Sequence, residues 1–288
     1  MRNNKLSIII IIIGVLINVN GIAQSKFSGF VPDSTSYYVI SLPTTMTKDA
    51  ILVDNDISNF PFLLIDDNML LLSNDNIDNP IAFSLPDKMH GSEDVFIIDT
   101  IIISKVSDTI KKYDGYDVAN IMIMPDDNYD IYLANYGYIY VIKHDADSSS
   151  VMLMEINTGK YVTLFKTPFH IENIVGDGLE CYITSGVIVF YVTEKDFIPI
   201  AIGDTDIQSI VSYEDGVFYS TQKACYYIGS KGLSYPFLLG DIKQLMLVDN
   251  RLYFLFRDGL LSVIDNADSY HKLLEKAINE QKIGKDDK

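Results

Sequence analysis

The sequence predicts an all-β protein in which one unit of short strands recurs along the chain. Two clear copies lie between residues 207 and 265, each with an apolar group, an acidic turn and two short aromatic or β-branched runs. Looser copies precede them. The 288-residue chain is 48% hydrophobic and 21% charged, which is the composition of a packed globular protein.

Residues 1–23 predict a cleavable secretory signal peptide. Arg2 and Lys5 give a positive start, residues 6–19 are apolar, and Gly21-Ile22-Ala23 places small residues before Gln24. A retained membrane anchor is the alternative, but the apolar run of about 14 residues falls short of the roughly 20 that span a bilayer. Since no cysteine follows the apolar run, we expect no lipid anchor and a periplasmic or secreted protein.

The chain is acidic, with a formal net charge of -17. Such a chain repels nucleic acid and anionic lipid surfaces, and it suits a basic partner or a cation. Acidic turn residues that keep a β protein soluble account for the same charge, so charge alone assigns no ligand.

Between residues 24 and 117 the predicted strands are unevenly spaced. Tyr37–Leu42 is the first, because aromatic and β-branched residues dominate it, and Pro43 ends it. Apolar runs predict further strands at 51–53, 62–65, 69–72, 81–85 and 95–106. The first repeat is counted from Ile57, and 111–117 is predicted to be a polar loop.

The repeat becomes regular in the second half of the chain. Its starts are placed at Val118, Ile171, Ile207 and Ile242, and the last three lie about 35 residues apart. Several short strands per period, joined by Asp-Gly or Asn-rich turns, predict the blades of a β-propeller over residues 24–265. We expect about six blades, with five to seven as the range, and two stacked smaller β domains as the alternative.

The chain resembles the propeller repeats of bacterial two-component sensor regions and of many exported bacterial propellers. The resemblance rests on an apolar pair, an Asp-Gly turn as at Asp177-Gly178 and Asp215-Gly216, a short strand and a Gly-aromatic strand. It covers about 57–264 and is best over 171–264. The chain lacks tryptophan, is irregular over 86–117 and has no kinase or DNA-binding region, so the resemblance implies architecture and not a sensor role.

Both ends of the predicted propeller have expected roles. The last copy shows three strands, so the strand Tyr37–Leu42 is predicted to complete it and close the ring. Residues 266–288 predict an amphipathic helix and a charged tail. Capping residues at 266–269 precede apolar positions spaced by three and four: Tyr270, Leu273, Leu274, Ala277 and Ile278. Packing on the propeller is favoured over presentation to a partner.

No catalytic, cofactor-binding or metal-binding residue is assigned. The histidines carry no Cys, His or Glu at zinc spacing and are expected on loops or at the rim: His90, His144, His170 and His271. Nucleophile motifs and a phosphate-binding glycine loop are absent. Asp145 and Asp147 begin like a calcium loop, but Ser150 and Ile156 occupy the positions of its glycine and its last acid.

Two cysteines and many tyrosines leave alternatives open. Cys181 and Cys225 fall on different strands of neighbouring repeats, so two buried thiols are favoured over a disulfide. Some tyrosines could stack on sugars, but most are expected in the blade interfaces: Tyr136, Tyr138, Tyr140, Tyr226, Tyr227 and Tyr253.

The sequence therefore predicts an exported, non-catalytic β-propeller that binds or scaffolds a protein partner in the cell envelope. A glycan-binding or small-ligand-binding propeller is the alternative. A propeller hydrolase or lyase is the third class, since the residues of such a site would be distant in sequence.

Overall fold

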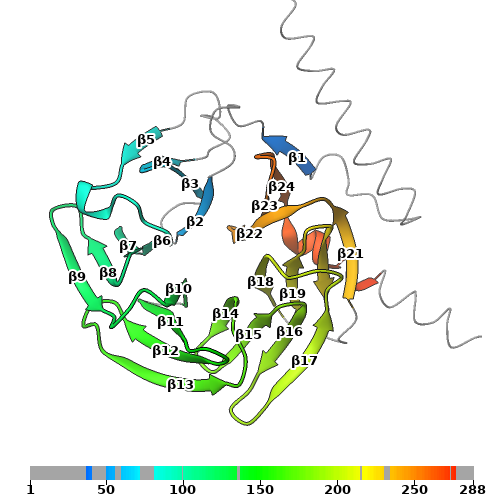
Figure 1. Cartoon of the computed structure of the whole chain (residues 1–288). Coiled ribbons are helices and arrows are strands. Elements are labelled where there is room, and N and C mark those ends of the chain that lie inside the picture. The colour runs from blue at the N-terminus through cyan, green and yellow to red at the C-terminus, as the bar shows by residue number, and fades with distance from the viewer. Residues whose placement is uncertain are drawn as a thin grey trace, which may run out of the picture.

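The structure, a computed structural model, is a ring of six four-stranded blades (Figure 1). It describes residues 37–40, 50–55, 60–71, 81–98, 100–134, 137–214, 216–229, 234–272 and 274–276. The predicted β-propeller with a short C-terminal helix is thereby confirmed. The predicted signal peptide and the charged tail lie outside the described residues.

The strands follow the chain from the inside of each blade to the outside. Blades 1 to 3 consist of β2 (Ile51–Asn55), β3 (Phe62–Ile65), β4 (Asn68–Leu71) and β5 (Ile81–Ser84); β6 (Val95–Ile98), β7 (Ile101–Val106), β8 (Thr109–Tyr113) and β9 (Val118–Ile123); and β10 (Tyr129–Leu133), β11 (Tyr138–His144), β12 (Ser149–Glu155) and β13 (Tyr161–Thr167). Blades 4 and 5 consist of β14 (Asn173–Asp177), β15 (Glu180–Ser185), β16 (Ile188–Val192) and β17 (Phe197–Ile202); and β18 (Ser209–Tyr213), β19 (Gly216–Ser220), β20 (Ala224–Ile228) and β21 (Ser234–Leu239). Blade 6 consists of β22 (Ile242–Val248), β23 (Arg251–Phe256), β24 (Leu261–Asp265) and β1 (Tyr37–Ile40).

The acidic turns of the sequence form the hairpins. Asp249 and Asn250, between β22 and β23, both have positive φ, at 46° and 60°. Two consecutive positive φ angles give a turn whose twist matches antiparallel strands, and Asp and Asn tolerate them better than most residues. Gly178 has φ 64° in the corresponding turn of blade 4.

The irregular segment before residue 124 is a full blade, which corrects three predictions. The strand predicted at 95–106 is the hairpin β6–β7, turned at Thr100 with φ 70°. The loop predicted at 111–117 begins within β8. Val118 starts β9, the outermost strand of blade 2, so the start of the next repeat is Tyr129. A threonine with positive φ is an uncommon turn signal, which is why the hairpin was missed.

The ring closes non-covalently, as predicted for the N-terminal strand. β1 pairs antiparallel with β24, from Tyr37 opposite Ile264 to Ile40 opposite Leu261. On the inner side, the Gln244 amide accepts a hydrogen bond from the Leu52 backbone N–H and donates one to the Leu52 carbonyl, each at 2.8 Å. Blade 6 is thus fastened to blade 1 at its inner strand and completed at its outer edge.

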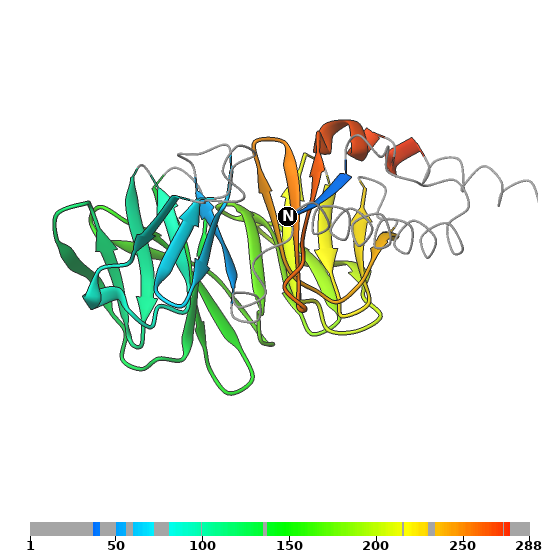
Figure 2. The same ribbon diagram turned by 90° about the horizontal axis from the view of Figure 1, so that it is seen from above.

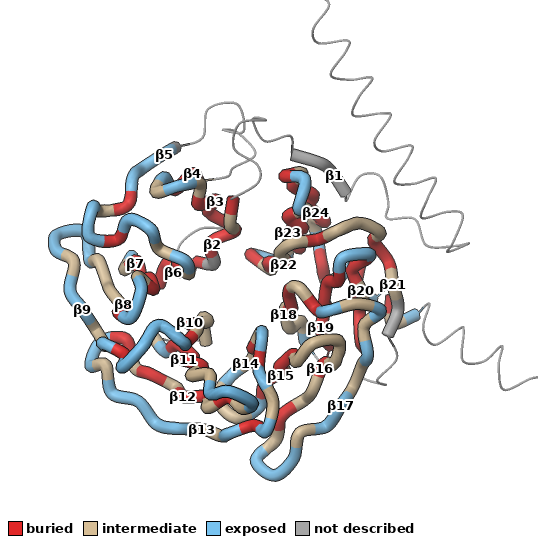
Figure 3. Tube along the Cα trace, in the orientation of Figure 1, coloured by how far each residue is buried: buried red, intermediate tan, exposed pale blue. Residues whose placement is uncertain are grey.

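Hydrophobic clusters between neighbouring blades form the core. The exposed residues gather on the outermost strands and the loops (Figure 3). The cluster of blades 5 and 6 contains 13 buried residues, whereas that of blades 4 and 5 contains six. Blades 1 and 2 are also joined by a short parallel pairing, with Asp54 opposite Phe96.

The C-terminal helix, residues 267–276, lies across one end of the ring (Figure 2). Ala267, Tyr270 and Leu274 are buried in the cluster of blades 5 and 6, which confirms the predicted packing for these residues. Leu273, Ala277 and Ile278 lie outside the described residues. Within the described part of the chain, no helix has the length and apolar character needed to span a membrane. Cys181 and Cys225 are both buried free thiols, as favoured.

Candidate functional site: the central channel and its two mouths

The inner strands β2, β6, β10, β14, β18 and β22 surround the axis of the ring (Figure 1), and we call the space along this axis, onto which the cavities below open, the central channel. Two cavities open on it. The Glu93 mouth is a cavity of about 510 Å³ at the beginnings of the inner strands, whose polar lining includes Glu93, Asp94, Asn173, Gln208 and Lys243. The Glu214 mouth is a cavity of about 760 Å³ at their ends, whose polar lining includes Asp177, Glu180, Tyr182, Tyr191 and Glu214.

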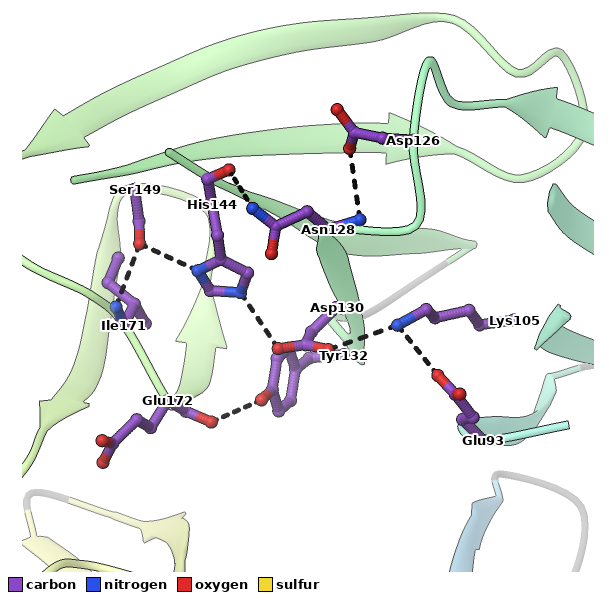
Figure 4. Close-up of polar contacts among 10 residues, drawn as sticks. All are labelled: Glu93, Lys105, Asp126, Asn128, Asp130, Tyr132, His144, Ser149, Ile171 and Glu172. Carbon is purple, nitrogen blue, oxygen red and sulfur yellow. Dashed lines mark hydrogen bonds and ion pairs between the residues drawn. The ribbon is translucent and has the colours of Figure 1, made fainter. Parts of the chain in front are cut away.

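A buried lysine joins blades 2 and 3 at the Glu93 mouth (Figure 4). Lys105 on β7 is 5% exposed, and its Nζ lies 3.0 Å from the Glu93 carboxylate and 3.5 Å from the Asp130 carboxylate. The ammonium also lies 5.0 Å from the centre of the Tyr129 ring. Burial lowers the pKa of Lys105, but the hydrogen bond with Glu93 and the charge of Asp130 outweigh it and raise the pKa overall.

His144, at the end of β11, extends this network to blade 4 (Figure 4). Its Nε2 lies 3.0 Å from Asp130 Oδ2 and its Nδ1 lies 3.1 Å from Ser149 Oγ, which accepts a hydrogen bond from the Ile171 backbone N–H at 3.0 Å. The hydrogen bond with His144 holds the pKa of Asp130 below its ordinary value. The His170 ring stacks on His144 with centroids 5.3 Å apart.

Backbone contacts complete the junction. The Tyr132 hydroxyl donates to the carbonyl of Glu172 on blade 4, and the Asn128 side-chain amide donates to the His144 carbonyl at 2.7 Å (Figure 4). The Asp126 carboxylate accepts from the Asn128 N–H at 3.1 Å and fixes the turn before β10. The polar groups of three blades therefore hold one another in place.

Asp94 lines the cavity beside this network. Burial, together with the negative charge of Asp130, raises the pKa of Asp94 to about 7, while the positive charge of Lys105 opposes the shift. A hydrogen bond from the Ile131 backbone N–H ties the Asp94 carboxylate to blade 3. Asp94 can therefore exchange a proton near neutral pH. Catalytic acids and buried structural carboxylates both show such a raised pKa, so the shift alone does not assign a catalytic role.

The arrangement at the Glu93 mouth suits a structural junction better than a catalytic one. General base catalysis needs a side-chain lone pair that can reach the substrate. Both ring nitrogens of His144 contact protein groups, and Lys105 lies between two carboxylates. In the described part of the chain, no three or more His, Cys, Asp or Glu side chains gather to hold a metal ion.

The Glu214 mouth continues outwards as a cleft between blades 4 and 5, the blade 4–5 cleft. Val175, Ser212 and Glu214 lie on or beside inner strands, and Ile200 lies on β17, the outermost strand of blade 4. Asp177 and Glu180 flank the β14–β15 turn at its rim and are exposed. Among the residues that the structure describes, the lining contains three carboxylates and no lysine or arginine.

Two tyrosines form a wall of this cleft. Tyr182 on β15 lies opposite Tyr191 on β16, and their ring centroids are 5.2 Å apart. Both are half-buried, and Tyr182 packs against the cluster of blades 4 and 5, which is the smallest of the six clusters between the described parts of the blades. The cleft thus combines aromatic faces, apolar floor residues and an acidic rim.

The C-terminal helix borders the Glu214 mouth. His271 is 8% exposed, contacts the Tyr213 and Tyr227 rings edge-on, and places Nδ1 3.5 Å from the Glu214 carboxylate. The Tyr227 hydroxyl donates to Glu275 Oε1 at 3.2 Å. The helix therefore fixes the position of one acidic residue of the mouth.

The expectation that all four histidines are scattered loop or rim residues is wrong. His144 and His170 stack, and His271 is buried on the helix, whereas His90 lies in a loop with its Nε2 3.0 Å from the Leu85 carbonyl. Residues 144 and 170 meet only through the register of blades 3 and 4, which spacing does not reveal.

The tyrosine expectations hold in part. Tyr140, Tyr227 and Tyr253 are buried between blades, as expected. Tyr226 stacks on Tyr219 and packs against the cluster of blades 4 and 5, also as expected, whereas Tyr138 is 39% exposed and Tyr136 lies outside the described residues. Tyr182 and Tyr191 were not predicted as site residues. Their equal distance from the Gly186-Val187 turn was the available signal, because it places them opposite each other in a hairpin.

The acidic turns show no calcium-binding geometry in the described residues. Asp145 and Asp147 are exposed in the β11–β12 turn. Asp66 and Asp67 form the β3–β4 turn, in which Asp66 has φ 49°.

No protein-family model matches the sequence, and no curated protein matches it. Solved structures of similar fold include a candidate gluconolactonase, at 10% identity and TM-score 0.60, with 84% of this chain and 96% of that chain covered. Virginiamycin B lyase from Staphylococcus aureus is similar at 10% identity and TM-score 0.53, over 80% and 99% of the two chains.

YCF48 bound to a D1 peptide is similar at 11% identity and TM-score 0.52, over 82% of this chain and 99% of that chain. These likenesses show the propeller fold. They include both named enzymes and a peptide-bound protein, so the fold alone does not assign the function.

Proposed function

We propose that this propeller is an exported, non-catalytic module that binds a protein partner at the Glu214 mouth. The observation that carries the proposal is the described lining of this mouth, in which three carboxylates and two tyrosines surround apolar residues and no described lysine or arginine takes part. Aromatic residues with a charged rim are typical of protein-recognition surfaces.

The two mouths differ in how many of their charged side chains form ion pairs within the protein. At the Glu93 mouth, Lys105 contacts Glu93 of its own blade and Asp130 of blade 3, and His144 also contacts Asp130. At the Glu214 mouth, Asp177 and Glu180 form no ion pair with another described residue. The Glu214 mouth therefore has charge available for a partner.

The partner is proposed to be a protein with a basic surface. The net charge of -17 attracts such a surface at long range, and the rim carboxylates would pair with it at contact. The peptide bound to YCF48 gives a precedent among proteins of similar fold. Export is proposed from the signal-like residues 1–23, which predict a place in the cell envelope.

A second candidate function is small-ligand or glycan binding at the Glu93 mouth. Its cavity of about 510 Å³ lies within the usual range for small-molecule sites, and amides and carboxylates line it. Saturable calorimetric binding of a metabolite or oligosaccharide, lost in a Gln208→Ala variant, would favour this candidate.

The proposal is tested by affinity capture from envelope extract with charge-matched variants. One variant carries Asp177→Asn, Glu180→Gln and Glu214→Gln; the control carries Asp145→Asn, Asp147→Asn and Asp206→Asn, exposed residues that lie away from the cleft. We expect one stoichiometric partner that the wild type and the control retain and the first variant loses. Equal retention by both variants would contradict the proposed site. Point substitutions are preferred to removal of the helix, because removal would uncover the core of blades 5 and 6.

A further inference from the structure

We infer that the blade 4–5 cleft binds an extended peptide segment of the partner in which basic and apolar side chains alternate. This inference rests on the proposed function and specifies the chemistry of the segment. It follows from the shape of the cleft, the order of its polar and apolar residues, and its unbalanced charge.

The shape favours an extended segment over a compact domain. The lining reaches from Ser212 on the inner strand of blade 5 to Ile200 on the outermost strand of blade 4. A volume of about 760 Å³ suits a few residues of peptide or a drug-sized molecule. A cleft that runs along the width of a blade accommodates a chain entering from the rim.

The lining presents two kinds of surface to such a segment. Ile200, Ile228 and Val175 give apolar contacts beside the Tyr182 and Tyr191 rings. Successive side chains of an extended peptide point to opposite sides. A segment that places apolar side chains against the tyrosines would therefore direct the alternate side chains towards the rim.

The rim selects cations. Asp177 and Glu180 stand together at the β14–β15 turn, and Glu214 faces the opposite side, with His271 3.5 Å away as its basic neighbour. Lysine and arginine side chains pair with carboxylates, and they also bind over tyrosine faces. An acidic segment would meet repulsion from three carboxylates.

The test uses a labelled, end-capped peptide of seven residues that alternates lysine with leucine. Fluorescence anisotropy should show saturable binding to the wild-type chain at low salt, weakened at high salt because exposed pairs are screened. Two control peptides replace either lysine by glutamate or leucine by serine, and we expect neither to bind measurably.

Variants locate the binding. Asp177→Asn with Glu180→Gln should raise the Kd roughly tenfold, because two exposed ion pairs are lost. Asp145→Asn with Asp147→Asn changes the net charge equally and should leave the Kd unchanged. Ser212→Arg, which places a cation in the lining, should abolish binding. Circular dichroism melts check that each variant is folded.

The outcomes separate this inference from the proposed function. Binding that the cleft variants leave unchanged, or binding of the serine-lysine peptide with equal affinity, would overturn the inference and indicate non-specific attraction to an acidic protein. Absence of peptide binding while a partner is still captured through the Glu214 mouth would also overturn it, and the proposed function would stand. If the wild-type chain neither binds the peptide nor captures a partner through the Glu214 mouth, the inference and the proposed function are both overturned.

Discussion

At the scale of single residues, the structure concentrates its unusual electrostatics around Asp94. Its carboxyl group lies beside Glu93 and Asp130, with Lys105 as the neighbouring cation. The pKa of about 7 means that folding raises the proton affinity of this group above its ordinary value of 3.8. In the unfolded chain Asp94 loses its proton near pH 4, whereas in the folded chain it keeps the proton up to about pH 7.

We expect Asp94→Asn to change the pH dependence of stability. Between about pH 4 and 7 the folded wild-type chain binds more protons than the unfolded chain, so its stability falls as pH rises through this window. Asparagine removes this loss and can still accept the hydrogen bond from the Ile131 N–H. From pH 4.5 to pH 8, the free energy of unfolding of the variant should therefore rise by about 1–2 kcal/mol relative to that of the wild type. This value is smaller than the full effect of the pKa shift, because solvent at the channel screens part of it.

Urea unfolding at the two pH values measures this difference. Asp145→Asn, at an exposed turn, is the control and should track the wild type at both pH values. An Asp94→Asn variant that also tracks the wild type would show that Asp94 is ionised in the folded chain at pH 4.5.

Single residues were also the least predictable from sequence. Asp130, His144 and His170 belong to one network, but only the pairing of β10, β11 and β12 and the packing of blade 4 bring them together. The strands themselves were predictable because alternation and turn residues act locally. Side-chain contacts between blades depend on register, which a single sequence does not specify.

At the scale of elements, the N-terminal strand and the C-terminal helix stabilise the same blade by different means. β1 supplies backbone hydrogen bonds to the edge of β24, and the helix supplies buried apolar side chains. The sequence predicted both roles, since a last repeat with three strands needs a fourth and an amphipathic helix needs an apolar surface. It did not predict the hairpin at Thr100, where the turn lacks a glycine or asparagine at the residue with positive φ.

We expect a chain that begins at residue 43 to be less stable than one that begins at residue 24. Four residue pairs with β24 are lost, which removes roughly 2–4 kcal/mol of backbone hydrogen bonding. The melting temperature should fall by about 5–10 °C for a domain of this size. Differential scanning calorimetry measures the shift, and equal melting temperatures would show that β1 adds nothing to the ring.

We expect Leu274→Ala to destabilise the protein by about 2–4 kcal/mol, because this fully buried side chain fills the core of blades 5 and 6. Lys272→Ala is the matched control on the same helix. Its side chain is 70% exposed and pairs with Asp268, so the change should leave the free energy of unfolding almost unchanged. Chemical unfolding compares them, and a similar small effect of both changes would mean that the helix is not part of the cooperative unit.

At the scale of the whole molecule, each hydrophobic cluster is formed by two neighbouring blades, so each blade buries its apolar side chains against the blades on both sides. Six blades were within the predicted range, because the period and the turns repeat along the chain. The blade boundaries in the first half were harder to predict, since the innermost strands begin at residues 51, 95 and 129 and the intervening loops differ in length.

We expect the two thiols to report one unfolding transition. Burial raises the pKa of Cys181 to about 12, and it also raises the pKa of Cys225, so neither should react with a disulfide reagent at pH 8 in the native protein. Cys181 lies in blade 4 and Cys225 in blade 5. With increasing denaturant, labelling followed by peptide mass spectrometry should show both reacting at one midpoint. Separate midpoints would mean that the two blades unfold independently.

The pairing of β1 with β24 also orders events in time. During synthesis Tyr37–Ile40 is made first among the described strands, yet its partner Leu261–Asp265 is made last. The strand must therefore wait, with its backbone groups unpaired, until almost the whole chain is complete. During that interval every growing chain carries a free strand and lacks its own acceptor, so its first strand can pair with β24 of another chain that is already complete. The last step of folding is thus a competition between closing one ring and linking two, and protein concentration decides between them.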